Sequence, residues 1–176
     1  MVDLKVTLPD WDQFEEALLR NPEIIAEECE TAMQQAVLLV EREVVKRTPV
    51  DQGRLRNSIA GDVKRTGEHV SGTVFSENVE HAPYVEYDTV PHFPPLKPIE
   101  DWVRRKGIGG VVRKGKLVQR PGADAVKQIA RAIAFKIFHH GTEGHHMFRD
   151  GAAAAFPRVQ RFFRDALQRI SDRFTT

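Results

Sequence analysis

Residues 48–59 have the sequence TPVDQGRLRNSI, in which a proline, an acid, a glycine and two arginines lie close together. Pro49 disfavours helical geometry in the residue before it, so we predict that a preceding helix ends here. Asp51 can cap a short turn that begins at Gln52. Gly53 allows a backbone conformation or a close approach that a side chain would block. The stretch therefore predicts a joint between a helix and a sheet.

Two apolar side chains of this stretch are expected in the core. Leu55 and Ile59 are four residues apart and can reach the core together. Arg54 and Arg56 then point away from Leu55, and they are either solvated or part of a contact between subunits. The structural motif predicted here consists of Pro49, Asp51, Gly53, Leu55 and Ile59.

A long helix is predicted before the joint, from Pro22 to about Arg47. Asn21-Pro22-Glu23 is typical of a helix start, because Asn can cap, Pro is tolerated at the first position and an acid favours the positive end of the dipole. Apolar residues at three- and four-residue steps form one stripe: Ile25, Cys29, Ala32, Met33, Ala36, Val37, Val40 and Val44. Further upstream we predict a short strand or an arm over 4–11 and a weaker helix over 11–19.

The pattern changes after the joint to two β-like segments, 59–65 and 70–76. Thr66-Gly67-Glu68 joins them as a hairpin turn. An apolar and aromatic segment, 79–87, follows, and then PHFPPLKP, which reads as an extended connector because it is rich in proline.

Three further helices are predicted from the remaining sequence. The first is the amphipathic IEDWVRRKG, with Gly107 as its stop. The second runs over 126–137 and ends near Gly141, and the third is C-terminal and opens at Pro157. We interpret the segment from Gly107 to Gly122, rich in Gly, Lys and Arg, as a projecting β-hairpin or mobile loop.

Together these elements predict an α+β fold. A long N-terminal helix packs on a small antiparallel sheet, and further C-terminal helices and a basic hairpin or loop insertion (107–122) complete it. A length of 176 residues fits one domain, 1–176, with a sizeable core.

The amino-acid composition limits the cellular environment and the binding partners that we expect for this protein. Lys+Arg 26 against Asp+Glu 25 gives a net charge of +1, so any electrostatic surface must come from local clustering. Cys29 is the only cysteine, which excludes an internal disulfide and a cysteine-based zinc site; we expect it to act as a small buried hydrophobe. The first residues lack a signal-peptide pattern, and no apolar run approaches the roughly 20 residues of a membrane span. We therefore expect a protein of a reducing cytoplasm with no membrane contact.

No catalytic or cofactor site is expected. The histidines His139, His140, His145 and His146 invite a metal hypothesis, but their spacing lacks the H-x-x-x-H pattern and flexible glycines separate the pairs. A triad of Ser58 or Ser76 with His81 and Glu86 has no nucleophile elbow. The glycines at 107–110 lack the lysine and hydroxyl of a phosphate loop. We expect no cofactor, and metal binding by the histidines stays open.

Lys and Arg residues cluster most densely within residues 104–120. These residues are Arg104, Arg105, Lys106, Arg113, Lys114, Lys116 and Arg120. This segment either is a solvated loop, contacts phosphates, or pairs with acids across an interface.

Two motifs resemble those of a family of neck and minor-tail proteins from long-tailed bacteriophages. TPVDQGRLRNSI is similar to the family's Pro-Val-Asp-x-Gly-x-Leu-Arg-x-Ser-Ile, and HAPYVEYDT to its Tyr-Ala-x-Tyr-Val-Glu-Tyr-Gly-Thr. His81 stands where the family usually has an aromatic residue, and Asp88 where it has glycine, so the turn after Tyr87 is expected to be built differently. The resemblance extends through IEDWVRRKGI and HHGTEGHHMFRDG to cover most of residues 34–170.

The resemblance implies a structural, non-enzymatic virion protein. It implies a ring subunit, which we expect to be a hexamer, in the neck or tail-completion complex that joins head to tail, made in the host cytoplasm. Its partners would be copies of itself, head-closure, adaptor or tail-tube proteins, and genomic DNA that passes without sequence-specific binding. The candidates for interface or DNA-channel residues are Arg54, Arg56, Tyr84, Glu86, Tyr87, Arg113, Lys114 and Lys116. The alternative is a nucleic-acid-binding module that uses the basic 104–120 segment.

Overall fold

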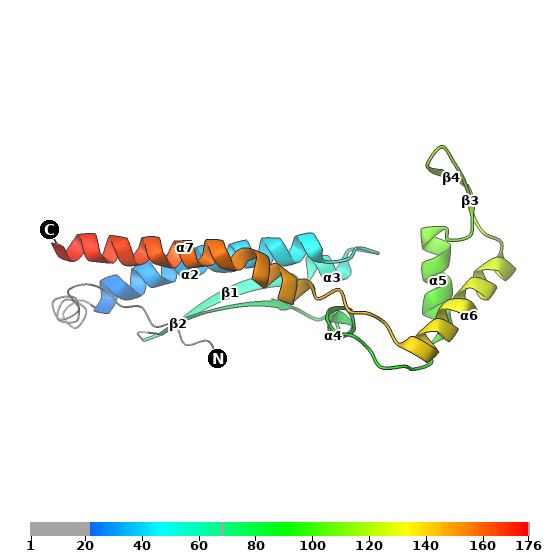
Figure 1. Ribbon diagram of the computed structural model, residues 1–176, viewed down its shortest axis with the longest axis horizontal. Coiled ribbons are helices and arrows are strands. Elements are labelled where there is room, and N and C mark those ends of the chain that lie inside the picture. The colour runs from blue at the N-terminus through cyan, green and yellow to red at the C-terminus, as the bar shows by residue number, and fades with distance from the viewer. Residues whose placement is uncertain (1–21, 68, 176) are drawn as a thin grey trace. The chain divides into compact units, whose positions relative to one another are not determined.

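The chain divides into two compact units, which we describe separately. The computed structural model describes residues 22–67 and 69–175 (Figure 1). The first unit is Met1–Ala82 with His145–Thr176, and the second is Pro83–Gly144. The expectation of a single domain stays a prediction.

Three predictions fall partly or wholly beyond the described residues. The strand or arm over 4–11 and the helix over 11–19 lie outside them, as does Glu68 in the predicted hairpin turn. The two strands that flank this turn are described, and they pair as predicted.

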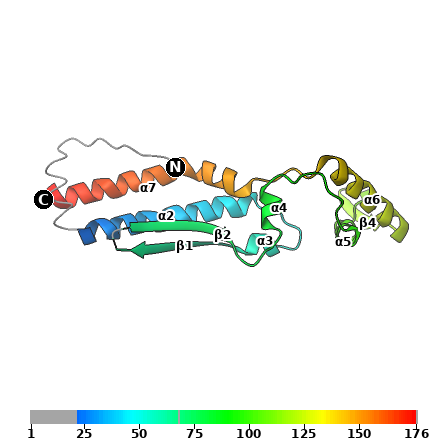
Figure 2. The same cartoon turned by 90° about the horizontal axis from the view of Figure 1, so that it is seen from below.

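Two long helices form the core of the first unit. Helix α2 (Pro22–Arg47) has the predicted bounds, and α7 (Met147–Thr175) lies beside it (Figures 1 and 2). The two run antiparallel, because Glu28 near the start of α2 meets Arg169 near the end of α7, whereas Val44 near the end of α2 meets Gly151 near the start of α7. The buried side chains between them include Ala32, Ala36, Val44, Ala155, Ala166 and Ile170.

Small residues let these helices approach closely. A Cβ on Gly151 would lie 2.9 Å from the backbone nitrogen of Val44, closer than such atoms can pack. Ala155, one turn further along α7, is completely buried. The alanine-rich stretch 151–155 therefore positions α7 against α2.

The predicted start of the C-terminal helix at Pro157 is wrong. Helix α7 begins ten residues earlier, at Met147, and Pro157 lies inside it. Proline lacks the N–H that would bond the carbonyl of Ala153 and normally ends or kinks a helix. Here the strong helix propensity of the preceding alanines and their burial against α2 outweigh this local signal.

An antiparallel hairpin covers another face of α2 (Figure 2). Strand β1 (Ile59–Thr66) pairs with β2 (His69–Ser76), with Ile59 opposite Ser76 and Thr66 opposite His69. Alternate residues on both strands are more buried, which identifies the face that packs on the helix. On that face a Cβ on Gly72 would lie 2.5 Å from Val37 Cγ2 of α2, and one on Gly61 would overlap Val37 too.

The second unit contains a helix pair and a second hairpin. Helix α4 (Ala82–Glu86) starts at the last residue of the first unit and leads through the proline-rich connector to α5 (Leu96–Lys106). The hairpin of β3 (Val111–Arg113) and β4 (Lys116–Gln119) precedes α6 (Ala123–His140), which packs on α5. Gly107 and Gly141 end α5 and α6 as predicted, each with positive φ.

The two ends of this unit are tied together. Thr89 and Thr142 form an isolated antiparallel bridge, in which the Thr89 N–H donates to the Thr142 carbonyl at 2.9 Å. Their hydroxyls are 2.8 Å apart. Gly141 permits this approach, because a Cβ there would overlap the carbonyl oxygen of Thr89.

Candidate assembly surfaces

Side-chain hydrogen bonds connect the joint between α2 and β1. The Thr48 hydroxyl donates to the Val44 carbonyl at 2.8 Å and so satisfies an acceptor at the end of α2. The Ser58 hydroxyl donates to the Leu55 carbonyl at 2.8 Å. It also lies 2.7 Å from the Ser76 hydroxyl, which connects the joint to the end of β2.

Gly53 begins the short helix α3 (Arg54–Asn57), and this changes the predicted role of Asp51. Gly53 has φ 81° and occupies the N-cap position without a side-chain cap hydrogen bond. Its special backbone conformation is confirmed, but the helical turn begins at Arg54 rather than Gln52, so the N-cap is not Asp51. A left-handed glycine makes the reversal between α2 and α3.

The side chains of the joint divide between core and surface as predicted. Leu55 and Ile59 are buried, with 6% and 7% exposure, whereas Arg54 and Arg56 are exposed. The joint therefore presents two cations on its outer side, and their place at an interface stays a prediction.

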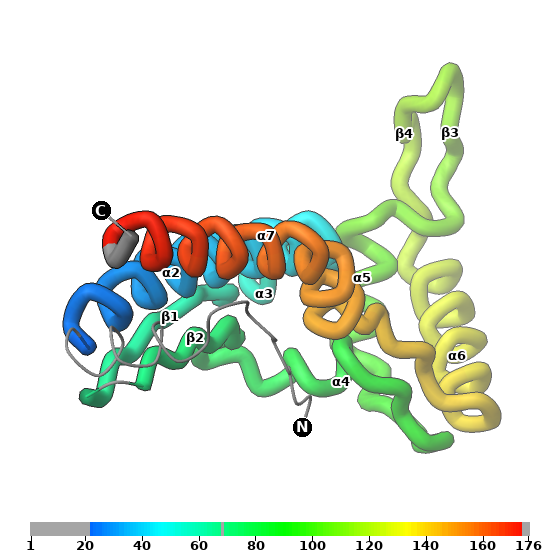
Figure 3. The backbone as a smooth tube through the Cα atoms, turned by 60° about the vertical axis from the view of Figure 1, so that its left-hand side comes forward, coloured from blue at the N-terminus to red at the C-terminus, as the bar shows by residue number. Residues whose placement is uncertain are grey.

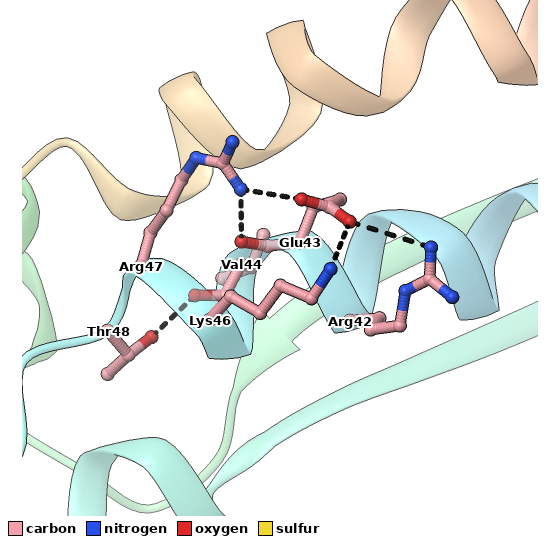
Figure 4. A network of polar contacts seen from close by, with 6 residues as sticks. All are labelled: Arg42, Glu43, Val44, Lys46, Arg47 and Thr48. Carbon is pink, nitrogen blue, oxygen red and sulfur yellow. Dashed lines mark hydrogen bonds and ion pairs between the residues drawn. The ribbon is translucent and has the colours of Figure 1, made fainter.

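A charged cluster lies on α2 just before the joint (Figure 4). Glu43 accepts hydrogen bonds from Lys46 Nζ and Arg47 Nη1, both at 2.8 Å. Arg42 Nη2 lies 3.6 Å from Glu43 Oε1. Hydrogen bonds from Lys46 and Arg47 lower the pKa of Glu43 to about 2. Arg47 also donates to the Glu43 carbonyl, so the cluster stabilises the last turn of α2.

A buried acid that the sequence did not reveal joins α2 to α7. Glu28 is almost fully buried and lies 2.7 Å from Arg169 Nε and 3.0 Å from Arg173 Nη2. Its negative charge, after burial itself, raises the pKa of the half-buried Cys29 thiol. Cys29 is thus less buried than expected. The 3.6-residue pattern marks Glu28 as a polar position, and only the arginines of the distant helix explain its burial.

The predicted tyrosines lie on the surface. Tyr84 and Tyr87 are 69% and 65% exposed, so neither belongs to the chain's own core. Glu86 between them is buried. A contact of the two tyrosines with another subunit stays a prediction.

The turn after Tyr87 is built around Asp88. Its carboxylate accepts a hydrogen bond from the Gly144 N–H at 2.8 Å. A Cβ on Gly144 would lie 2.5 Å from the Glu86 carbonyl oxygen. Asp88 stands where the resembled motif has glycine, and its hydrogen bond to Gly144 therefore stabilises the turn.

The basic hairpin extends away from the helices of its own unit (Figure 3). Every residue from 111 to 120 is exposed. Arg113, Lys114 and Lys116 surround the tight turn, in which Lys114 and Gly115 have positive φ. Leu117 marks its base, since its side chain fills the space beside Gly107 and Gly110. Hairpin formation is confirmed, and the cations are free to face solvent or another molecule.

Exposed apolar residues accompany these charges. Val112 and Val118 on the hairpin are 60% and 57% exposed. On α6, Phe135 and Phe138 are exposed as well, and Phe138 packs edge-to-face on Phe93 with ring centroids 6.3 Å apart. The apolar periodicity of this helix placed neither phenylalanine in the core, which agrees with their exposure.

The histidines show no metal-binding geometry in the part of the chain that is described. Among residues 22–67 and 69–175, no three His, Cys, Asp or Glu side chains are grouped to hold an ion. His139 packs against Phe135 with centroids 4.4 Å apart. No described helix has the length and apolar character that crossing a membrane requires.

A comparison with protein families finds a match to part of the chain. Residues 12–87 match the family described as "Bacteriophage HK97-gp10, putative tail-component". The chain is similar to this family over these residues. A search of the curated proteins and a search of the solved structures found no match.

The HK97-gp10-like match confirms the resemblance found in the sequence. It covers α2, the joint, the β1–β2 hairpin and α4, and it supports a structural protein of a phage tail. It ends before α5, the basic hairpin and α7. The extension of the resemblance to residue 170 stays a prediction.

Proposed function

We propose that this protein is a ring-forming subunit of a phage neck or tail-completion complex. Six copies would close a ring around the DNA channel and join the head to the tail. The observation that carries the proposal is the match over residues 12–87 to the family described as "Bacteriophage HK97-gp10, putative tail-component". The role is structural and non-enzymatic, and its site is the virion.

Charge segregation supports contacts between unlike surfaces. Residues 83–144 contain 11 Lys and Arg against 6 Asp and Glu, a net charge of +5. The rest of the chain contains 15 against 19, a net charge of −4. A ring is closed by two different surfaces of each subunit, and opposite charges on those surfaces favour head-to-tail association.

The basic hairpin is a candidate for one of these surfaces. Arg113, Lys114 and Lys116 lie at its tip beside exposed Val112 and Val118. Apolar area stabilises a contact when it leaves water, and the charges select an acidic partner. The partners are the next copy and neighbouring head-closure, adaptor or tail-tube proteins.

A triple substitution tests the hairpin's role. Arg113→Gln/Lys114→Gln/Lys116→Gln removes three charges but keeps chain length and backbone preference. We expect the melting temperature of the isolated chain to stay close to wild type, while the yield of infectious particles falls. The matched control is Lys127→Gln/Arg131→Gln/Lys136→Gln, which removes three exposed charges from α6 of the same unit. Equal particle yields for the two triple variants would contradict a specific role of the hairpin.

The second candidate function is non-specific nucleic-acid binding through residues 104–120. The exposed cations of this segment favour it, and phosphate contacts would make the affinity fall steeply with salt. DNA that passes through a ring requires no such affinity. Tight, salt-dependent binding of duplex DNA by a monomer would favour this second function over the ring.

A further inference from the structure

An open apolar groove lies in the first unit between α2, β2 and α7. It has a volume of about 440 Å³, and every residue that lines it is apolar. Val37, Val74 and Phe163 represent the three elements in this lining. Phe156 lies four residues after Ala152, which also lines the groove, so both face the same side of α7. Phe156 is exposed and widens the apolar surface at this groove.

Four rings touch one another on the surface of the second unit, and we call them the aromatic patch. Phe93 packs on Phe138 with ring centroids 6.3 Å apart, Phe138 on His139 at 5.0 Å, and His139 on Phe135 at 4.4 Å. The three phenylalanines are 48% to 63% exposed. If each has about 200 Å² of surface, they leave about 350 Å² in water. Patches of roughly 300–600 Å² on a monomer are often functional.

The aromatic patch has the spacing of a helix that docks in a groove. Phe135, Phe138 and His139 occupy positions i, i+3 and i+4 of α6, which are the anchor positions of a helix that lays an apolar face into an apolar groove. A phenylalanine ring gives up no hydrogen bond when it leaves water, whereas a cation in an apolar groove would lose its hydration without a partner. The groove therefore suits the aromatic patch better than it suits the cationic tip of the basic hairpin.

Charge favours contact between these two unlike surfaces of separate copies. The groove belongs to the part of the chain with a net charge of −4, and the aromatic patch to the part with +5. Arg131 and Lys136 are exposed on α6 beside the patch. Opposite net charges attract a patch to a groove, whereas two patches or two grooves would bring like charges together. The charges thus favour head-to-tail over symmetric pairing.

We propose that Phe135 and Phe138 of one copy dock in the apolar groove of the next copy. The inference rests on the proposed ring, because a ring is closed by one contact between two unlike surfaces, repeated from copy to copy. Each copy supplies both halves of this contact. The contact removes from water the apolar surface that a separate copy leaves exposed.

Two variants of the full-length chain each remove one half of the contact. Phe135→Gln removes a ring but keeps a good helix former, and Ala152→Lys lays a lysine stem in the groove. Both residues are exposed, so the fold should be kept. We expect each variant to weaken self-association at least tenfold in analytical ultracentrifugation. The matched controls are Leu38→Gln, at an exposed apolar residue of α2, and Ala153→Lys, at the next exposed residue of α7, and both should associate as the wild type does.

A mixture of the two variants tests whether the patch meets the groove. The Ala152→Lys copy keeps its patch and the Phe135→Gln copy keeps its groove, so one contact can form between them. At a concentration where each variant alone is monomeric, we expect one-to-one pairs of about 40 kDa, twice the 20.0 kDa of the chain. Nothing larger should form, because the two halves that remain in each pair are both defective.

The proposal would be overturned by a mixture that stays monomeric, or by either variant associating as strongly as the wild type. If Ala152→Lys lowers the melting temperature without weakening association, another segment of the same chain fills the groove, which also contradicts the proposal. If Ala152→Lys unfolds the chain, Ala152→Gln supplies the milder test.

The same measurements separate this contact from the proposed ring. A ring of six that both variants still form would contradict the contact alone. One-to-one pairs in the mixture, together with a wild-type assembly that is not a closed ring, would contradict the ring alone. A wild type that stays monomeric at every concentration would contradict both.

Discussion

Arg169 Nε donates a hydrogen bond to Glu28 Oε2 at 2.7 Å and so joins α7 to α2 across 141 positions of the sequence. Arg173 Nη2 lies 3.0 Å from the other carboxylate oxygen. A carboxylate this deeply buried is tolerated because two guanidinium groups replace its water. The pair therefore specifies how the two long helices align.

Arg169→Ala is expected to destabilise the chain. It leaves the buried Glu28 carboxylate with one arginine, and because the arginine side chain is half-exposed the expected cost is about 1–2 kcal/mol of unfolding free energy. Denaturant unfolding measures it. Arg161→Ala, an exposed position on the same helix, serves as the control and should change the free energy by less than about 0.5 kcal/mol. Equal effects would show that the ion pair contributes nothing specific.

Gly151→Ala tests the close approach of α7 to α2. Alanine has a better helix propensity than glycine by about 1 kcal/mol, so an open site would gain stability. The new Cβ would instead meet the backbone of Val44, which cannot move aside as a flexible side chain can. We expect a net loss of about 1–3 kcal/mol. A raised melting temperature would contradict the packing described here.

Gly53 is expected to tolerate asparagine better than alanine. Its φ of 81° lies in the left-handed region, where an alanine costs about 1–2 kcal/mol and asparagine less. Thermal unfolding of Gly53→Ala and Gly53→Asn compares them directly. Two indistinguishable melting curves would show that the joint relaxes without cost.

Glu43 gives the stability of α2 a defined pH dependence. Its pKa in the folded chain is about 2, below the ordinary value of 4.5, because Lys46 and Arg47 donate hydrogen bonds to it. A lowered folded pKa means that the contribution is fully present above about pH 4.5 and is lost as the pH falls toward 2. The difference in unfolding free energy between wild type and Glu43→Gln should therefore be constant near neutral pH and shrink across this window. A difference that does not change with pH would contradict the cluster's role.

The local signals in the sequence were sufficient for most of the first unit. Pro22 and Pro49 mark the ends of α2, and alternation marks β1 and β2, because these signals act between neighbours in the chain. The helix start predicted from Pro157 was wrong because the packing of Gly151 and Ala155 against α2 is a tertiary effect, which local signals do not contain. The burial of Glu28 depends likewise on arginines that are distant in sequence.

The candidate surfaces were predicted less completely than the fold. Charge density identified the hairpin with Arg113 and Lys116, since composition alone shows that such residues must stay wet or meet a partner. The exposure of Tyr84, Tyr87 and Phe135 could not be read from their types, because aromatic residues are common both in cores and at interfaces.

The mass of the purified full-length chain in solution tests the central claim most directly. Light scattering at moderate salt, with images of the particles, should show a closed ring of six 20.0 kDa copies, about 120 kDa. A particle that remains monomeric at every concentration, or an open filament without a closed ring, would contradict the account.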